Sequence, residues 1–237
     1  MVQPSFDRLE KRIGYHFQNK GLLMEALTHS SYAQEVSQRV SDNERMEFLG
    51  DAVLNLAVTV RLTQAFPDYD EGKLSLARAG LVAANHLAKV AAGLELGKYL
   101  RLSPSEEKSG GRNKPNILAD ALEALLAAIF CDGGLAPATA FVERMVLPPD
   151  LSSHVNGLLA TNYKGALQER LQAEHQPVAH YHVVEEDGLE HEKTFTVEVQ
   201  AGDGVVARGS GGSKKAAQQQ AAKRALEILA AKVEADG

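Results

Sequence analysis

Residues 43–54 read NERMEFLGDAVL, and this stretch decides the fold. In a helix that turns about 100° per residue, Glu44, Glu47 and Asp51 fall within about 60° of one another. The apolar residues on the opposite side are Met46, Leu49, Val53 and Ala57. The stretch therefore predicts an amphipathic helix with one acidic face and one core face.

A second stretch, NILADALEALLAAIF at residues 116–130, repeats this arrangement. Asp120 and Glu123 stand three residues apart, and their neighbours are alanines and leucines, so the helix should be buried on nearly all sides. Ser41 with Glu44 predicts a capping box for the first helix, and Asn116 predicts the N-cap of the second.

Paired acidic residues on one helix are more often a solvated face than a site. Buried carboxylates on two helices are different, because four of them within about 4 Å would repel by about 4 kcal/mol per pair at an effective dielectric constant of about 20. Divalent cations remove this cost, and oxygen ligands suit Mg²⁺ or Mn²⁺, which assist phosphoryl chemistry. The periodicity predicts a carboxylate metal site and nothing more specific.

The length of 237 residues allows two domains, and the composition is that of a globular protein, with 44% hydrophobic and 24% charged residues. Helical periodicity fills the first 160 residues. The pattern then changes to a helix at about 163–174, strands that include 180–184 and 194–199, and a last helix at about 213–232. We expect an all-helical domain at 1–157, followed by a small α-β-β-β-α domain at 161–237.

Composition and sequence also exclude several classes of protein. A single cysteine, Cys131, allows neither an intramolecular disulfide nor a cysteine-based zinc site. The apolar runs are too short to cross a bilayer, and charges interrupt the N-terminal segment, so we expect a soluble, cytoplasmic protein with no membrane partner. With 25 Lys and Arg against 31 Asp and Glu, the formal net charge is −6, so any nucleic-acid binding must come from a local patch.

Such a patch lies between Asp203 and Glu227, an interval that contains no acidic residue. The positive residues in this interval are Arg208, Lys214, Lys215, Lys223 and Arg224. Lys214 and Lys215 follow a glycine- and serine-rich loop and open the last helix, where free N–H groups favour phosphate. A plain glycine loop with solvated lysines is the alternative. The spacing matches neither phosphate-binding glycine motif of nucleotide sites, so no nucleotide cofactor is expected.

NERMEFLGDAVL closely resembles the signature of the ribonuclease III family. The resemblance extends to ALTHSSY (26–32), DEGKLS (70–75) and the block at 110–134. It implies an all-helical endonuclease domain that forms a homodimer and hydrolyses double-stranded RNA with Mg²⁺, with Mn²⁺ as an alternative ion. The products would carry 5′-phosphate and 3′-hydroxyl ends, and the substrates would be ribosomal and other structured RNA.

The same resemblance assigns roles to individual acidic residues. It implies metal ligands at Glu47, Asp51, Asp120 and Glu123, of which Asp51 and Glu123 are the catalytic pair, and further active-site carboxylates at Glu44 and Glu71. Ala52 stands where many members have serine, and Met46 where leucine is common. Phe48, on the acidic side of its helix, matches an apolar knob that inserts into a partner subunit; a core position is the alternative.

The C-terminal segment resembles a double-stranded RNA-binding domain. The resemblance implies RNA contacts at Gln168, Glu169, His191, Lys214, Lys215 and Gln218. The first helix and the loop with His191 would read minor grooves, and the last helix would read phosphates. Gly165 stands where a hydroxyl or longer side chain is frequent, which removes one expected contact.

Two other functions compete with the endonuclease. A non-catalytic double-stranded RNA-binding or ribosome-associated protein could use the same folds, but it would have no reason to keep all six carboxylates. Hydrolysis through zinc or a side-chain nucleophile is not supported, because the sequence has no HExxH, CxxC or GxSxG motif.

Overall fold

The computed structural model describes residues 5–36, 40–188, 193–201 and 204–235. The chain divides into two compact units between Val155 and Asn156. The boundary falls within one helix, α10 (Leu151–Ala160). The expected domain limits, 1–157 and 161–237, stay a prediction.

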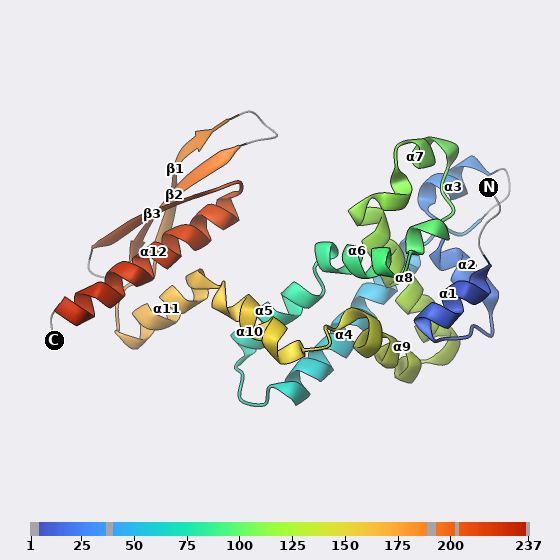
Figure 1. Cartoon of the computed structure of the whole chain (residues 1–237), viewed down its shortest axis with the longest axis horizontal. Helices are drawn as coiled ribbons and strands as arrows, with labels where there is room; N and C mark the ends of the chain where they lie inside the picture. The colour runs from blue at the N-terminus through green and yellow to red at the C-terminus, as the bar shows by residue number, and fades with distance from the viewer. Residues whose placement is uncertain (1–4, 37–39, 189–192, 202–203, 236–237) are drawn as a thin grey trace. The chain divides into compact units, whose positions relative to one another are not determined.

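Helices make up the described part of the first unit (Figure 1). The α-helices before α10 are α1 (Phe6–Ile13), α2 (Lys20–Ala26), α3 (Ser30–Glu35), α4 (Glu44–Ala65), α5 (Glu71–Leu81), α6 (Ala84–Gly93), α7 (Pro104–Lys108), α8 (Pro115–Gly133) and α9 (Leu135–Phe141). Short turns of other helix types are η1 (Leu96–Lys98), η2 (Gly111–Asn113) and η3 (Val142–Val146).

Helix α8 is the centre of this unit. It contacts α2, α4, α6 and α9, and its residues from Ile117 to Leu122 and from Ala124 to Ile129 are buried except for Asp120. A helix that is apolar on all sides is stable only when other helices surround it. The burial expected from the alanines and leucines of this stretch is therefore observed.

Helices α4 and α8 approach so closely at Gly50 that no side chain fits between them. A Cβ atom built on Gly50 would lie 1.9 Å from the carbonyl oxygen of Glu123. The neighbour is backbone, which a rotamer change cannot move aside. Glycine at this position therefore sets the distance between the two helices that carry the acidic residues.

Both predicted helix starts are wrong. Helix α4 begins at Glu44 without a side-chain cap from Ser41; instead, the carboxylate of Asp42 accepts the Glu44 N–H at 3.3 Å. A short acidic side chain can bond to the backbone two residues further on, which competes with a capping box. Helix α8 begins at Pro115, before Asn116, because the fixed φ of proline suits the first helical position.

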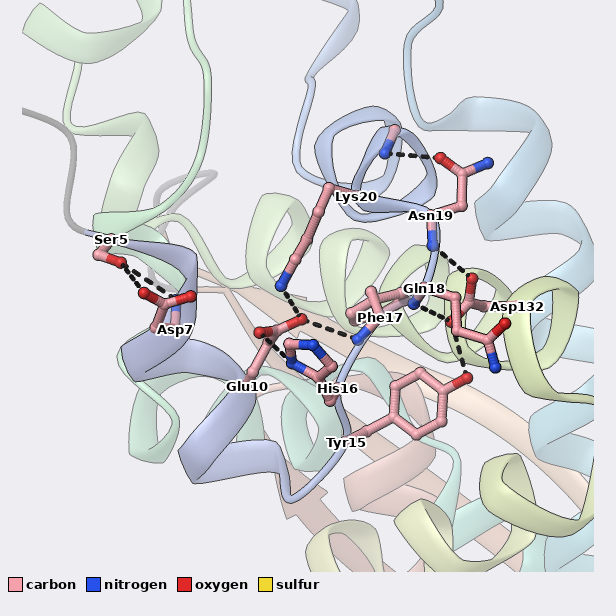
Figure 2. A network of polar contacts seen from close by, with 11 residues as sticks. Ser5, Asp7, Glu10, Tyr15, His16, Phe17, Gln18, Asn19, Lys20 and Asp132 are labelled. Carbon is pink, nitrogen blue, oxygen red and sulfur yellow. Dashed lines mark hydrogen bonds and ion pairs between the residues drawn. The ribbon is translucent and has the colours of Figure 1, made fainter.

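The segment between α1 and α2 is fastened to the end of α8 by one carboxylate, that of Asp132 (Figure 2). Asp132 accepts hydrogen bonds from the Tyr15 hydroxyl at 2.8 Å and from the backbone N–H groups of Gln18 and Asn19 at 2.9 Å. These bonds satisfy backbone donors at the start of α2 and hold the N-terminal helices against the core.

A second carboxylate, Glu10 of α1, holds the same segment from the other side (Figure 2). Glu10 is 5% exposed; it accepts the Phe17 N–H at 2.8 Å, contacts His16 Nδ1 at 3.0 Å and forms an ion pair with Lys20. Burial opposes its ionisation, but the bonds from Lys20 and Phe17 outweigh burial, so the pKa of Glu10 lies below its usual value.

The second unit has the expected α-β-β-β-α order (Figure 1). Its elements are α11 (Tyr163–Ala173), β1 (His180–Asp187), β2 (Thr194–Ala201), β3 (Val205–Gly211) and α12 (Lys214–Ala235). The strands form an antiparallel sheet in the order β1-β2-β3, with Val197 opposite Val183 on one side and Gly209 on the other.

Both helices of this unit share one core with the sheet. Its buried residues include Leu167, Leu171, Val197, Val199, Ala217, Ala221 and Ala225. Gly209 lets α12 lie directly on β3, since a Cβ there would be 2.1 Å from the backbone nitrogen of Ala221. No helix within the described residues is long and apolar enough to span a membrane.

Gly50→Ala should lower the free energy of unfolding by about 1–3 kcal/mol, because the added methyl group forces α4 and α8 apart. Chemical denaturation measures this loss. Gly93→Ala is the control: Gly93 is also helical, as the last residue of α6, but open space surrounds it, so this variant should be as stable as the parent or slightly more stable. Equal stability of both variants would contradict the close approach.

Glu10→Gln should lower stability near neutral pH and have less effect in acid. A carboxylate whose folded pKa is below its unfolded pKa stabilises the fold above the unfolded pKa, and this contribution disappears as the pH falls through the folded pKa. Denaturation of parent and variant near neutral pH and in acid measures the difference. Asp7→Asn, on the exposed side of α1, should change stability much less. A Glu10→Gln effect that grows in acid would contradict this assignment.

Candidate functional site

The structure brings four of the predicted carboxylates together: Glu47 and Asp51 on α4, and Asp120 and Glu123 on α8. Their proximity appears in their mutual effects on ionisation. We call these four residues the carboxylate cluster. They come from the two helices that meet at Gly50.

Glu123 is the most perturbed residue of the carboxylate cluster. Burial, followed by the charges of Asp51, Glu47 and Asp120, raises the pKa of Glu123 to about 7. Glu47 is affected in the same direction: burial, then the charges of Asp120, Glu44 and Asp51, raise its pKa. The cluster thus holds more negative charge than its surroundings compensate, and a bound cation would relieve it.

Asp120 is the one member with a described cationic neighbour. Burial raises the pKa of Asp120, and the charge of His29 opposes this rise. His29 lies at the start of α3, where its Nδ1 accepts the Ser31 N–H at 3.2 Å.

Asp51 is exposed and is oriented by its own helix. Asn55, one turn later on α4, donates from Nδ2 to Asp51 Oδ1 at 2.8 Å and to the Asp51 backbone oxygen at 2.9 Å. A carboxylate that is restrained in this way loses less conformational entropy when it binds a ligand.

The two remaining predicted carboxylates, Glu44 and Glu71, are not members of the carboxylate cluster. Glu44 is exposed at the start of α4, and its charge reaches Glu47. Glu71 begins α5, accepts the Ser75 hydroxyl at 2.7 Å, and lines a cavity of about 330 Å³ with Arg78 and residues of α4. Glu71 is absent from the charges that act on Glu47 and Glu123, so nothing in the described contacts joins it to the carboxylate cluster.

The donor chemistry of the carboxylate cluster fits a hard divalent cation, since all its ligand atoms are carboxylate oxygens. Within the described part of the chain, no three histidine, cysteine, aspartate or glutamate side chains stand close enough to form a ready metal cage. The fit therefore rests on oxygen donors and uncompensated charge, and coordination would need rotation of these side chains.

Phe48 projects from α4 beside an open groove. Its side chain is 83% exposed, which rules out the core alternative. The groove has a volume of about 720 Å³. Its lining residues are Leu22, Glu25, Glu44, Arg45, Met46, Phe48, Leu49 and Cys131. One surface thus carries both a protruding aromatic ring and a hollow of mixed apolar and charged lining.

The predicted RNA contacts of the second unit lie on α11 and α12, apart from one. Gln168 is half-buried and Glu169 is exposed on α11. Lys215 is exposed at the start of α12, and Gln218 is half-buried one turn later. His191 lies outside the described residues.

The positive charges near α12 are partly neutralised by the sheet. Lys214 pairs with Glu186 of β1 at 2.8 Å, and this hydrogen bond holds the pKa of Glu186 below its usual value. Arg208 pairs with Glu198 of β2 at 2.8 Å. Although the sequence between Asp203 and Glu227 has no acidic residue, two of its basic residues therefore have acidic partners on neighbouring strands.

Sequence reasoning missed three residues that act on these surfaces: His29, Asn55 and Lys164. His29 lies within the ALTHSSY block, so the family resemblance could have indicated it as a site residue. Asn55 lies four residues after Asp51, a spacing that permits a hydrogen bond on one helix face. Lys164 donates to Gln218 at 2.7 Å, a contact between residues far apart in the chain that no local pattern reveals.

Two family models match the chain. Residues 19–150 match a model described as ribonuclease-III-like, and residues 163–229 match a model of the double-stranded RNA binding motif. The first match includes every residue of the carboxylate cluster. The second includes α11, the three strands and most of α12.

Relatives are similar over nearly the whole chain. Ribonuclease 3 of Solibacter usitatus is 47% identical over 93% of this chain and 86% of its own length. Ribonuclease 3 of Syntrophobacter fumaroxidans is 44% identical over 97% of this chain and 98% of its own length. A solved nuclease domain of ribonuclease III from Campylobacter jejuni, described for flexibility in a region involved in dimer formation, is 42% identical. It covers 60% of this chain and 96% of its own, with a TM-score of 0.57.

Proposed function

The chain belongs to the ribonuclease III family and is an endoribonuclease of double-stranded RNA, and we propose that its carboxylate cluster binds Mg²⁺ for hydrolysis of the phosphodiester bond. The observation that carries this proposal is the direct contact of α4 and α8 at Gly50, which brings their acidic residues together; burial and three neighbouring carboxylates raise the pKa of Glu123 there to about 7. Uncompensated negative charge in a partly buried site is the condition that a divalent cation relieves.

The four residues of the carboxylate cluster have different roles in this proposal. Asp51 and Glu123 are the catalytic ligands in this proposal, and Glu47 and Asp120 complete the ligand set. Bound Mg²⁺, or Mn²⁺ in its place, would activate water and stabilise the leaving oxygen, which yields 5′-phosphate and 3′-hydroxyl ends.

Surrounding residues position this ligand set. Asn55 restrains the Asp51 carboxylate through its 2.8 Å hydrogen bond. His29 places an imidazole near Asp120 and offsets part of the cost of its charge. Glu44 adds negative charge beside Glu47. Glu71, expected as a further active-site carboxylate, has no described contact with the cluster and is given no part in this ligand set.

The second unit supplies RNA affinity. The double-stranded RNA binding motif at 163–229 includes the predicted contacts of α11 and α12. Contacts to phosphates and 2′-hydroxyls recognise the shape of a duplex more than its sequence, so ribosomal and other structured RNA are the proposed substrates. A non-catalytic RNA-binding protein is not favoured, because the curated relatives are ribonucleases and the carboxylate cluster is complete.

We also propose a homodimer built on Phe48 and its groove. An exposed aromatic ring is costly in water, and a two-fold axis would place each ring in the groove of the partner. The relative from Campylobacter jejuni is described with a region involved in dimer formation, which supports a dimer but does not bear on the role of Phe48. Two sites in a dimer would give one carboxylate cluster for each RNA strand.

Glu123→Gln tests the function. The change preserves shape but removes a charge and a ligand, so cleavage of a perfect RNA duplex in Mg²⁺ should fall by several orders of magnitude while RNA binding persists. Gel analysis of cleavage and a binding assay in EDTA measure the two effects. Higher metal concentration or Mn²⁺ should restore part of the activity.

Glu143→Gln serves as the control, because Glu143 is exposed in η3 and lies outside the carboxylate cluster. This variant should cleave at the parental rate. Near-parental cleavage by Glu123→Gln in limiting Mg²⁺ would show that Glu123 is not a ligand. Parental cleavage that needs no metal would overturn the metal proposal.

Phe48→Asp should convert the dimer to monomers with little double-strand cleavage, because the interface would have to bury a charge. Sedimentation measures the oligomeric state. Leu135→Asp places the same charge on another exposed apolar residue, one that does not line the groove, and should leave the dimer intact. An unchanged dimer for Phe48→Asp would remove Phe48 from the interface.

A further inference from the structure

Two neighbouring glutamines of α12 bond to the start of α11 in different ways. Gln219 uses both ends of its amide inside the protein: Oε1 accepts the Lys164 backbone N–H at 3.0 Å, and Nε2 donates to Asn162 Oδ1 at 3.4 Å. Gln218 uses its oxygen, which accepts from Lys164 Nζ at 2.7 Å. Among the described residues, no protein acceptor is recorded for the Gln218 NH₂ group.

The chemistry of lysine fixes the orientation of the Gln218 amide. An ammonium group has three donors and no acceptor, so only the carbonyl oxygen of Gln218 can face Lys164. The amide nitrogen must then point away from Lys164. In this arrangement the carbonyl end of Gln218 faces Lys164, and the NH₂ end, which can only donate, is the end presented away from Lys164.

Lys164 is itself held in place on three sides. Its backbone N–H is bonded to Gln219, its Nζ to Gln218, and its ammonium lies 4.5 Å from the centroid of the Tyr181 ring on β1. The Tyr181 hydroxyl is buried, so this ring is fixed in the core of the unit. A side chain restrained by two elements, α12 and β1, pays little further entropy on binding.

Gln218 lies on the same face of α12 as the two predicted phosphate contacts. It follows Lys214 by four residues and Lys215 by three, and residues at these spacings are neighbours on a helix surface. This face continues the positively charged start of the helix by one turn. Phosphate oxygens accept hydrogen bonds and donate none, so they bind the NH₂ end of an amide and not its carbonyl end.

We propose that Lys164 is a positioning residue for RNA binding: by holding the Gln218 carbonyl oxygen, it orients the amide so that the Gln218 NH₂ group donates to a phosphate oxygen of duplex RNA. The inference rests on the proposed RNA-binding role of α12. It adds that Lys164, a residue of α11, determines which end of the Gln218 amide is available to RNA. The adjacent positive charge of Lys164 also polarises the amide and strengthens its N–H donors.

Equilibrium binding of a perfect RNA duplex to the full chain tests this proposal, with EDTA present to prevent cleavage. Lys164→Met keeps the apolar stem over Tyr181 but removes the donor, and should weaken binding about tenfold, the effect of one hydrogen bond to a charged group. Gln218→Ala should weaken binding to a similar degree. The double variant should bind no more weakly than either single variant, because both changes remove one contact.

A rescue experiment separates positioning from packing. A lysine side chain presents donors to a phosphate without needing a neighbour to orient it. Gln218→Lys in the Lys164→Met background should therefore restore binding to near the parental value. Gln220→Lys in the same background adds an equal charge at an exposed position off this face and should not restore it. Gln219→Ala is the structural control: it should lower the melting temperature of the unit, whereas Gln218→Ala should not.

Additive losses in the double variant would show that Lys164 and Gln218 act separately and would overturn the proposal. Equal rescue by lysine at positions 218 and 220 would do the same, because charge alone would then explain it. A parent chain that fails to bind duplex RNA in this assay would overturn the RNA-binding role of α12 itself. A parent that binds, with no coupling between Lys164 and Gln218, would leave that role intact and refute only the positioning.

Discussion

The close approach of α4 and α8 at Gly50 is the constraint on which the rest of the first unit depends. Because a Cβ at this position would lie 1.9 Å from the Glu123 carbonyl oxygen, the two backbones are in direct contact. The same contact brings the acidic faces of both helices together. Core packing and the candidate site are thus set by one interhelical distance.

The fold carries an electrostatic cost at this contact. Burial and like charges raise the pKa values of Glu47 and Glu123, so the carboxylate cluster is less stable ionised than it would be in water. Helix α8 can bear this cost because it is buried on nearly all other sides. Stability elsewhere in the core therefore maintains a site that is unfavourable by itself, as is common for catalytic sites.

Charge is managed differently in the second unit. The sheet places Glu186 beside Lys214 and Glu198 beside Arg208, so two of the basic residues already have partners. RNA that binds Lys214, as proposed above, would have to compete with Glu186. Lys164, which no carboxylate is recorded to contact among the described residues, joins the start of α12 from another helix. The proposed RNA-binding surface therefore involves α11 as well as α12.

The sequence by itself determined the two acidic helix faces, the burial of the second of these helices and the α-β-β-β-α order. These features follow from periodicity and turn residues, which are local properties of the chain. Helix starts at Ser41 and Asn116 were predicted wrongly, because Asp42 and Pro115 compete for the same backbone groups. The sequence could not predict that α4 and α8 meet at Gly50, that no described contact links Glu71 to the carboxylate cluster, or that Lys164 bonds to Gln218. Each of these depends on distances between segments remote in sequence, and such distances follow from packing of the whole core.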